Sequence, residues 1–173
     1  YNTLPQTGVA VCAPVEESDT VTLYAEPDES SDMLFHYYSG TVAEVLEVQR
    51  AWIRVRIGQG EAALEGWMPA RDLTYSVWRE RDVAHVVRWY TAEAGEQAVY
   101  AAPDENAKVL RQTLPSEIME VNGISTDDWV QLSWYDNEPV TGFARLGEDA
   151  ELGKPMRAEV YHVNPLDDEL SFE

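Results

Sequence analysis

The chain has 173 residues, and its 32 acidic and 12 basic side chains give it a formal net charge of −20 at pH 7. This charge repels the phosphates of nucleic acids and of anionic membrane surfaces, so no nucleic acid is expected as a partner. An apolar content of 45% and six tryptophans are typical of a packed protein rather than of a disordered acidic chain. No apolar run approaches the roughly 18 residues that cross a bilayer, so no membrane insertion is expected either.

The N-terminal part contains the single cysteine, Cys12, which excludes an intrachain disulfide and a thiolate metal cluster. It lies in the apolar stretch Val9–Ala13, where a cysteine acts as a small core residue rather than as a nucleophile. Leu4–Gly8 is similar to a sortase sorting motif but lies far from the C-terminal position of such signals, so we assign it no role. From the start at Tyr1 rather than at a methionine, an export signal or a tag is expected upstream.

The residues that follow alternate between apolar and polar side chains, which predicts strands. After a leading strand at Ala10–Cys12, the loop Pro27–Ser31 has a proline and short polar side chains that favour a turn. Further strands are expected over Thr41–Val48 and Trp52–Ile57, joined by a tight turn at Gln49–Ala51. Sustained helical periodicity is absent from the sequence, so this module is expected to be a small all-β barrel of about five strands.

The same pattern returns 76 residues later along the chain. Leu23–Glu29 recurs as Val99–Glu105, and the leading strand has its counterpart in Val86–Arg88. The match continues further along the chain. Trp52–Val55 corresponds to Trp129–Leu132 after a slip of one residue, and Gly66-Trp67 corresponds to Gly142-Phe143 at the original spacing. A fixed spacing between similar segments means that one supersecondary unit is used twice, so the sequence predicts two equivalent modules.

The repeat and the polar segments around its copies predict the domain boundaries. Residues 9–78 are expected to form the first barrel with its leading strand, and residues 83–146 the second barrel with its own. A linker is expected over 79–82, and a C-terminal extension with one short strand over 147–173. The predicted fold is therefore all-β, with two small β-barrels in tandem and additional flanking strands.

Each module resembles a bacterial SH3-type (SH3b) domain, whose pattern runs from an opening strand and a proline loop to a closing Gly-Trp and Leu. The first module supplies Leu23, Pro27, Ser30, Ser31, Met33, Leu34, Gly40, Val42, Val45, Trp52, Val55, Gly66, Trp67 and Leu73. The second supplies Val99, Pro103, Val109, Leu110, Ile118, Val121, Trp129, Leu132, Gly142, Phe143 and Leu146. Ser116 replaces a glycine of the pattern and Phe143 its second tryptophan, so the second module is the more diverged copy. The resemblance implies SH3-like barrels.

Two segments, Thr22–Tyr24 and Gly66–Pro69, are also similar to aromatic segments of eukaryotic SH3 domains. Proline-rich peptides lie on several aromatic ridges in that family. Glu26 and Asp72 stand where two of the tyrosines would be, so the groove is incomplete. Binding of proline-rich peptides is therefore not expected.

Aromatic residues at equivalent positions of the two modules are the candidate ligand-binding residues: Tyr24, Trp52, Trp67, Tyr100, Trp129 and Phe143. Aromatic rings dominate the packing of small barrels, so each ring belongs either to the core or to a ligand surface, and the sequence leaves both open. Exposed rings would form a shallow platform for a sugar face or an extended peptide, enlarged in the first module by Tyr37, Tyr38 and Tyr75.

The remaining polar residues predict neither catalysis nor a cofactor. The histidines are far apart and lack metal-ligand spacing: His36, His85 and His162. Clusters of carboxylates leave a weak Ca²⁺ site open, although none matches an EF-hand loop: Glu16-Glu17-Asp19, Asp127-Asp128 and Asp167-Asp168-Glu169. No metal site is assigned, and the chain is not expected to be an enzyme.

The SH3b resemblance implies a non-catalytic binding module of an exported bacterial protein, secreted or associated with the cell envelope. Its expected partner is a cell-wall peptide or glycan, bound through shallow aromatic grooves. The alternative is a protein-protein interaction or spacer module that docks a basic protein partner through its acidic surface. Salt discriminates between them, because exposed charges are screened beyond about 8–10 Å at physiological ionic strength.

Overall fold

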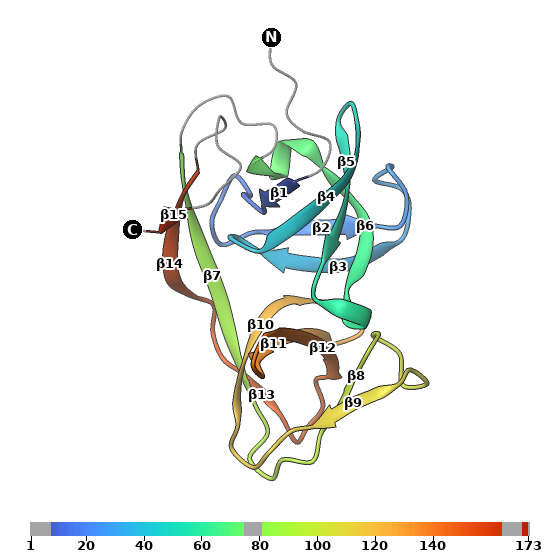
Figure 1. The fold of residues 1–173 in the computed structure, drawn as a ribbon, viewed down its shortest axis with the longest axis vertical. Coiled ribbons are helices and arrows are strands. Elements are labelled where there is room, and N and C mark those ends of the chain that lie inside the picture. The colour runs from blue at the N-terminus through green and yellow to red at the C-terminus, as the bar shows by residue number, and fades with distance from the viewer. Residues whose placement is uncertain (1–7, 75–80, 164–170, 173) are drawn as a thin grey trace. The chain divides into compact units, whose positions relative to one another are not determined.

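A computed structural model describes residues 8–74, 81–163 and 171–172 of the chain. These residues form strands and two short 3₁₀ turns, so the expected all-β class is confirmed. Within the same ranges, no helix is long and apolar enough to cross a bilayer. The strands, labelled in Figure 1, are β1 (Gly8–Val11), β2 (Thr20–Tyr24), β3 (Met33–Tyr38), β4 (Val42–Gln49), β5 (Trp52–Ile57), β6 (Leu64–Pro69), β7 (Arg81–Thr91), β8 (Ala98–Tyr100), β9 (Val109–Gln112), β10 (Ile118–Ile124), β11 (Trp129–Tyr135), β12 (Pro139–Arg145), β13 (Glu151–Leu152), β14 (Met156–Val163) and β15 (Ser171–Phe172). The two 3₁₀ turns are η1 (Gly60–Ala62) and η2 (Ala70–Asp72).

The chain divides into two compact units. Unit 1 comprises residues 1–57, 65–86 and 157–173, and unit 2 comprises residues 58–64 and 87–156. The segment between β5 and β6 therefore belongs to unit 2. The predicted domain boundaries stay predictions, although Arg81 and Asp82 of the expected linker already belong to β7.

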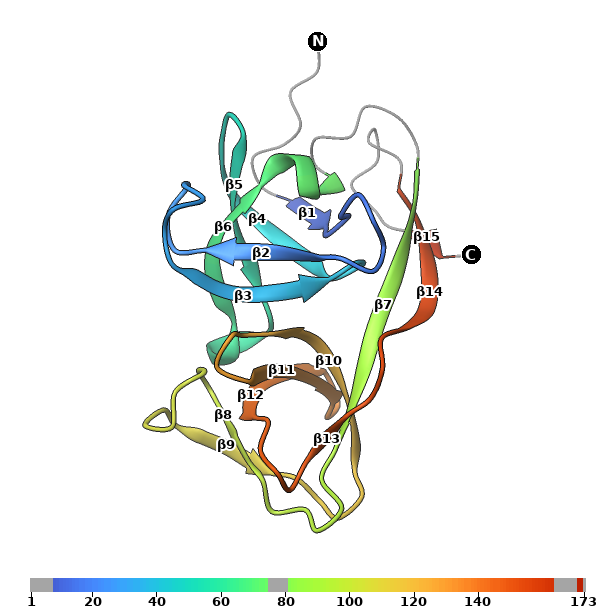
Figure 2. The ribbon, with the colours of Figure 1, turned by 180° about the vertical axis from the view of Figure 1, so that it is seen from behind.

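In unit 1 the strands follow the order β1-β4-β5-β6-β2-β3, which is an open path rather than a closed barrel. Figure 2 shows β2 and β3 side by side, as their antiparallel register requires. β4 has a bulge between Val45 and Glu47 where it pairs with β5. β6 meets β2 through the pair of Trp67 and Tyr24. A bulge bends its strand and increases its twist, so the sheet curls without closing.

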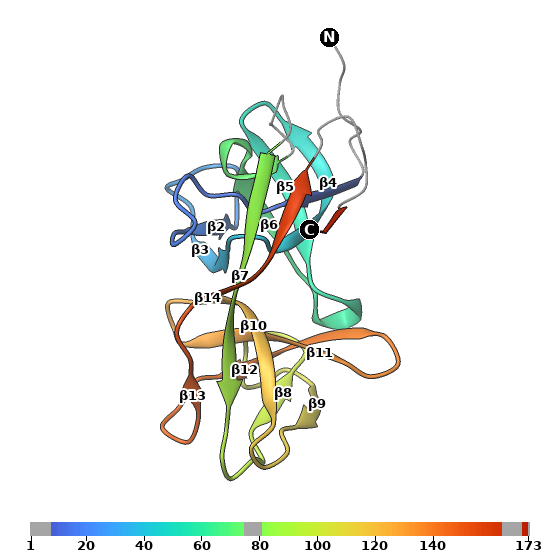
Figure 3. The same cartoon turned by 90° about the vertical axis from the view of Figure 1, so that its left-hand side faces the viewer.

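Unit 2 repeats this order strand for strand, as β7-β10-β11-β12-β8-β9. Figure 3 shows β10 beside β7, with which it pairs. β12 meets β8 through Phe143 and Tyr100, the counterparts of Trp67 and Tyr24. The bulge of β4 returns in β10, between Val121 and Gly123. The sequence repeat therefore corresponds to a repeated strand order.

The two proline loops are held by the same kind of local hydrogen bond. The Asp28 carboxylate accepts a hydrogen bond from the backbone N–H of Ser30 (2.9 Å). Asp104 accepts one from the N–H of Asn106 (2.9 Å) in the second loop. The bonds to Ser30 hold the pKa of Asp28 below its usual value. Both loops therefore contain the side-chain turns that their composition favours.

Each unit has its own apolar core, built from inward-facing residues of its strands. β5 alternates between buried and half-buried residues along its whole length, as its sequence pattern predicts. Fully or almost fully buried residues of unit 1 include Val21, Leu23, Phe35, Tyr37, Ile53, Val55 and Met68. Those of unit 2 include Tyr90, Val99, Met119, Val121, Val130, Leu132 and Phe143.

The turn that leads into β4 has a left-handed backbone at Gly40, with φ of +86°. A Cβ at this position would lie 2.4 Å from the Cα of His85 and 2.8 Å from the carbonyl oxygen of Ala84, both in unit 1. In unit 2, Ser116 takes the place of the glycine and has φ of +57°. The second copy therefore keeps the left-handed turn at a conformational cost of about 1–2 kcal/mol.

Gly40→Ala is expected to lower the free energy of unfolding by at least about 2 kcal/mol, because the left-handed strain and the backbone clash add. The measurement is urea unfolding followed by tryptophan fluorescence. Gly147→Ala is the matched control, since a Cβ there meets nothing within 4 Å. Equal unfolding free energies for the two variants would contradict the role of Gly40.

Candidate functional site

Unit 1 presents an aromatic pair formed by two of the predicted ligand-binding residues. Tyr24 ends β2 and Trp52 begins β5, and their ring centroids lie 5.5 Å apart at an interplanar angle of 86°. Both side chains are half-buried, whereas Trp67, opposite Tyr24 in β6, is only 9% exposed. The edge-to-face contact fixes the rings while leaving part of each surface accessible.

β6 passes very close to β2 beside this pair. A Cβ on Gly66 would lie 2.7 Å from the carbonyl oxygen of Tyr24 and 2.8 Å from the Cγ of Leu23. Only a glycine permits this approach. The Gly-Trp of the sequence pattern therefore allows Trp67 to pair with Tyr24.

A shallow groove lies next to Trp52 at the turn between β4 and β5. It is lined by Pro27, by residues 48–51 and by Trp52 itself. Arg50, at the tip of the turn, has φ of +44° and contributes a positive charge to the groove. The groove combines an aromatic face, a proline and exposed backbone, which suits an extended polar ligand.

Unit 2 carries the equivalent aromatic pair, but its own side chains cover more of it. Tyr100 and Trp129 have ring centroids 5.6 Å apart at 75°. The Arg145 guanidinium lies 5.9 Å from the centre of the Trp129 ring and donates a hydrogen bond to Glu105 (2.9 Å). Trp129 is 5% exposed and Phe143 is fully buried, so Tyr100 is the accessible ring of this unit.

The structure thus separates the six predicted aromatic residues by exposure. Tyr24, Trp52 and Tyr100 are half-buried, whereas Trp67, Trp129 and Phe143 lie in or next to the cores. Two of the tyrosines expected to enlarge the platform, Tyr37 and Tyr38, are buried as well. Tyr75 lies outside the described residues, as do residues 4–7 and the cluster 167–169.

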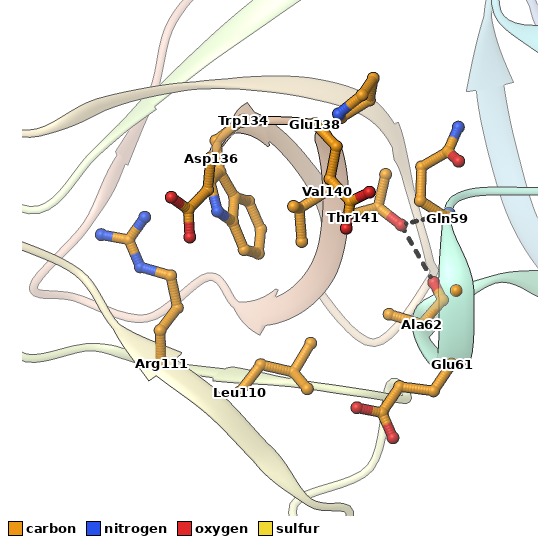
Figure 4. Close-up of a pocket in the computed structure, with 12 residues that line it drawn as sticks. Gln59, Glu61, Ala62, Leu110, Arg111, Trp134, Asp136, Glu138, Val140 and Thr141 are labelled. Atoms are coloured by element: carbon orange, nitrogen blue, oxygen red, sulfur yellow. Dashed lines mark hydrogen bonds between the residues drawn. The ribbon is translucent and has the colours of Figure 1, made fainter.

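Unit 2 also contains a pocket of about 340 Å³ that the sequence analysis did not find (Figure 4). Its walls come from β9, β11, β12 and the segment around η1, and Trp134 is its aromatic member. In the repeat, Trp134 takes the place of Ile57, which is buried in unit 1. The sequence shows the exchange of isoleucine for tryptophan but does not show which segments enclose it.

Cys12 is fully buried, and its thiol lies 3.9 Å from the sulfur of Met68. Burial raises the pKa of this thiol far above its ordinary value, and the carboxylate of Asp72 raises it further. A thiolate is the nucleophilic form of cysteine. Cys12 is therefore a protonated core residue at neutral pH.

The histidine and acidic side chains that the structure describes are not gathered into a metal site. In the described part of the chain, no group of three or more His, Cys, Asp or Glu side chains could hold a metal ion. His36 shares a hydrogen bond with the Thr22 hydroxyl (2.9 Å), and burial lowers the pKa of its ring. In the first acidic cluster, Glu17 accepts two hydrogen bonds from Arg157. His85 lies in β7, and the side chain of His162 is outside the described set.

Residues 17–74 match the sequence profile of the bacterial SH3 domain family. This segment contains β2 to β6 and, of the six predicted ligand-binding residues, Tyr24, Trp52 and Trp67. The assignment of the second module to the same family stays a prediction. No curated protein matches the sequence.

Solved structures that match this chain include NlpC2 and NlpC1 from Trichomonas vaginalis, with 12% and 10% identity and TM-scores of 0.37 and 0.38. The matches cover 85% and 87% of this chain and 49% and 48% of those proteins. An NlpC/P60 family protein from Bacillus cereus has 13% identity and a TM-score of 0.31, over 86% of this chain and 56% of that protein. The chain thus spans about half the length of these proteins, and similarity this remote carries no argument about function.

The thiol of Cys12 is expected not to react with Ellman's reagent in the native protein at pH 8, and to react fully in urea. Burial excludes the reagent and holds the thiol in its protonated form. The measurement is the absorbance of the released thionitrobenzoate. Stoichiometric reaction of the native protein within minutes would show that Cys12 is accessible and would contradict this placement.

Proposed function

Because residues 17–74 form a bacterial SH3 domain, we propose that the chain is a non-catalytic binding module of an exported bacterial protein. Its proposed ligand is a polymer of the cell envelope, either a peptidoglycan peptide or a glycan. The ligand binds the surface of Tyr24 and Trp52 and the groove beside them.

The observation that carries this proposal is the half-buried pair of Tyr24 and Trp52 within the matched residues 17–74. The rings of Tyr24 and Trp52 are held edge to face, so little conformational entropy is lost when a ligand covers them. Tryptophan and tyrosine supply large contact areas with a polar edge, which suits the mixed apolar and hydroxyl faces of a sugar or the backbone of a peptide. The adjoining groove at residues 48–51 extends the contact.

Tyr100 offers a second, weaker contact in unit 2. It is half-buried and has an edge-to-face partner in Trp129, as Tyr24 has in Trp52. Two weak sites on one chain increase the avidity for a polymer when both engage. A polymeric ligand therefore suits the repeat better than a monomeric one.

The net charge of −20 limits how such a ligand is bound. Anionic wall polymers are repelled by the acidic surface, so binding must come from stacking and hydrogen bonds at the aromatic pair. These contacts depend little on ionic strength. Salt-insensitive binding is therefore the signature of the proposed function.

A second candidate function is the docking of a basic protein partner, and the excess of acidic residues favours it. Such a complex depends on long-range attraction between opposite charges. Screening by salt weakens this attraction beyond about 8–10 Å. Docking of a basic partner therefore weakens as ionic strength rises, whereas binding at the aromatic pair changes little.

The Trp52→Ala variant is expected to bind isolated peptidoglycan sacculi about tenfold more weakly than the wild type, a loss of about 1.4 kcal/mol. The measurement is co-sedimentation at about 50 and 500 mM salt. Removing the Trp52 ring removes contact area at the centre of the site, which lowers the affinity. Added salt leaves the stacking contacts, and therefore the affinity, almost unchanged.

Tyr135→Ala is the matched control, since Tyr135 is 75% exposed and lies outside the aromatic pair. Circular dichroism first shows that both variants are folded. Equal losses in the two variants, or no sedimentation of the wild type at either salt concentration, would overturn the proposal. Wild-type binding that disappears at high salt would instead support docking of a basic polymer or partner.

A further inference from the structure

The pocket of unit 2 has a fixed wall on the side of η1. The hydroxyl of Thr141 in β12 accepts a hydrogen bond from the backbone N–H of Gln59 (2.8 Å). It also donates one to the carbonyl oxygen of Ala62 (3.3 Å). Both bonds are drawn in Figure 4. The segment around η1 is therefore tied to β12 and forms one side of the pocket of about 340 Å³.

Polar and apolar side chains together line this pocket, and three apolar ones lie next to one another in it. Leu110 of β9, Trp134 of β11 and Val140 of β12 border the same space, as Figure 4 shows. All three side chains are half-buried, so each keeps a face that another group can cover. Covering such faces removes apolar surface from water, at about 25 cal/mol for each Å². An aliphatic chain is the natural occupant.

Some of the charges at the rim are already paired within unit 2. Arg111 donates a hydrogen bond to Glu117, and its guanidinium lies 5.3 Å from the centre of the Trp134 ring. Glu61 forms an ion pair with Lys108 (3.1 Å). In each of these two pairs a positive and a negative side chain cancel, so the pairs add little net charge to the pocket.

Two further carboxylates remain. Asp136 and Glu138 line the pocket, are exposed, and have no side-chain ion pair or hydrogen bond within the described part of the chain. The backbone N–H of Asp136 donates to the carbonyl oxygen of Glu138 (3.0 Å), which closes the turn between β11 and β12. Asn137, between them, has φ of +62°. This tight turn therefore places both acidic residues in the lining of the pocket.

We propose that this pocket binds a peptide side chain with an aliphatic stem and a terminal ammonium group, as in lysine. The stem covers Leu110, Trp134 and Val140, and the ammonium group lies between Asp136 and Glu138. An anionic side chain is repelled by these carboxylates. A purely apolar one fills the pocket but gains nothing from the charges at the rim.

The inference is independent of the proposed function, because the pocket shares no residue with the aromatic pair. Tyr24 and Trp52 belong to unit 1, whereas Leu110, Trp134 and Val140 belong to unit 2. The Trp52→Ala variant, which tests binding to sacculi, therefore leaves this pocket intact. The proposed function and the proposed pocket ligand can be contradicted separately.

The test is an NMR titration of the ¹⁵N-labelled full chain with the capped tripeptide acetyl-Gly-Lys-Gly-amide. Resonances of the Trp134 indole N–H and of the Val140 and Thr141 amides are expected to shift with saturation. Acetyl-Gly-norleucine-Gly-amide has a similar stem without the ammonium group, and it is expected to bind several-fold more weakly. The glutamate tripeptide is expected to produce no saturable shift.

The double variant Asp136→Asn, Glu138→Gln removes both charges while keeping the size of the side chains. It is expected to weaken binding of the lysine peptide about three- to tenfold, as the loss of two exposed ion pairs predicts. Glu148→Gln, Asp149→Asn is the matched control, since both are exposed carboxylates of unit 2 outside the pocket, and it is expected to bind as the wild type.

Three outcomes would overturn the proposal. Equal affinities for the lysine and norleucine peptides would show that the ammonium group contributes nothing. Equal weakening by both double variants would show a general effect of charge rather than a site. Shifts that avoid Trp134, Val140 and Thr141, or no saturable shift, would show that the pocket does not take this side chain.

Discussion

The close approach of two strands at a glycine is the constraint on which the rest of each unit depends. β6 crosses β2 at Gly66 and β12 crosses β8 at Gly142, where a Cβ would lie 2.5 Å from the side chain of Val99. In both units this crossing joins the strands on either side of it into one curved path. Next to each of these close approaches, Tyr24 and Tyr100 lie edge to face with Trp52 and Trp129.

Electrostatics set the second constraint, because acidic residues far outnumber basic ones. Several arginines form ion pairs with nearby carboxylates. A guanidinium nitrogen of Arg71 lies 2.8 Å from a carboxylate oxygen of Glu29, and one of Arg145 lies 2.9 Å from a carboxylate oxygen of Glu105. Exposed pairs of this kind add little stability. Their effect is positional, because Arg145 is held over Trp129 and Arg111 over Trp134. The carboxylates without a basic partner account for the net charge of −20.

Much of the fold was predictable from local patterns. Alternating residues predicted strands such as β5, and proline with short polar residues predicted the loop at Asp28, because both depend on near neighbours in the chain. The repeat predicted a second copy, and the structure has the same strand order twice. The exposure of the six aromatic residues was not predictable. Phe143 and Tyr24 occupy similar apolar contexts in the sequence, yet Phe143 is fully buried and Tyr24 is not.

The sequence by itself determined the all-β class, the repeat, the acidic surface and the aromatic positions that recur, since composition and short-range spacing encode these features. The tertiary structure alone decided which rings are accessible and that residues 59–62, in the link between β5 and β6, line a pocket with Trp134. Burial and enclosure depend on contacts between residues that are distant in the chain, such as Gln59 and Thr141. A local pattern does not carry that information.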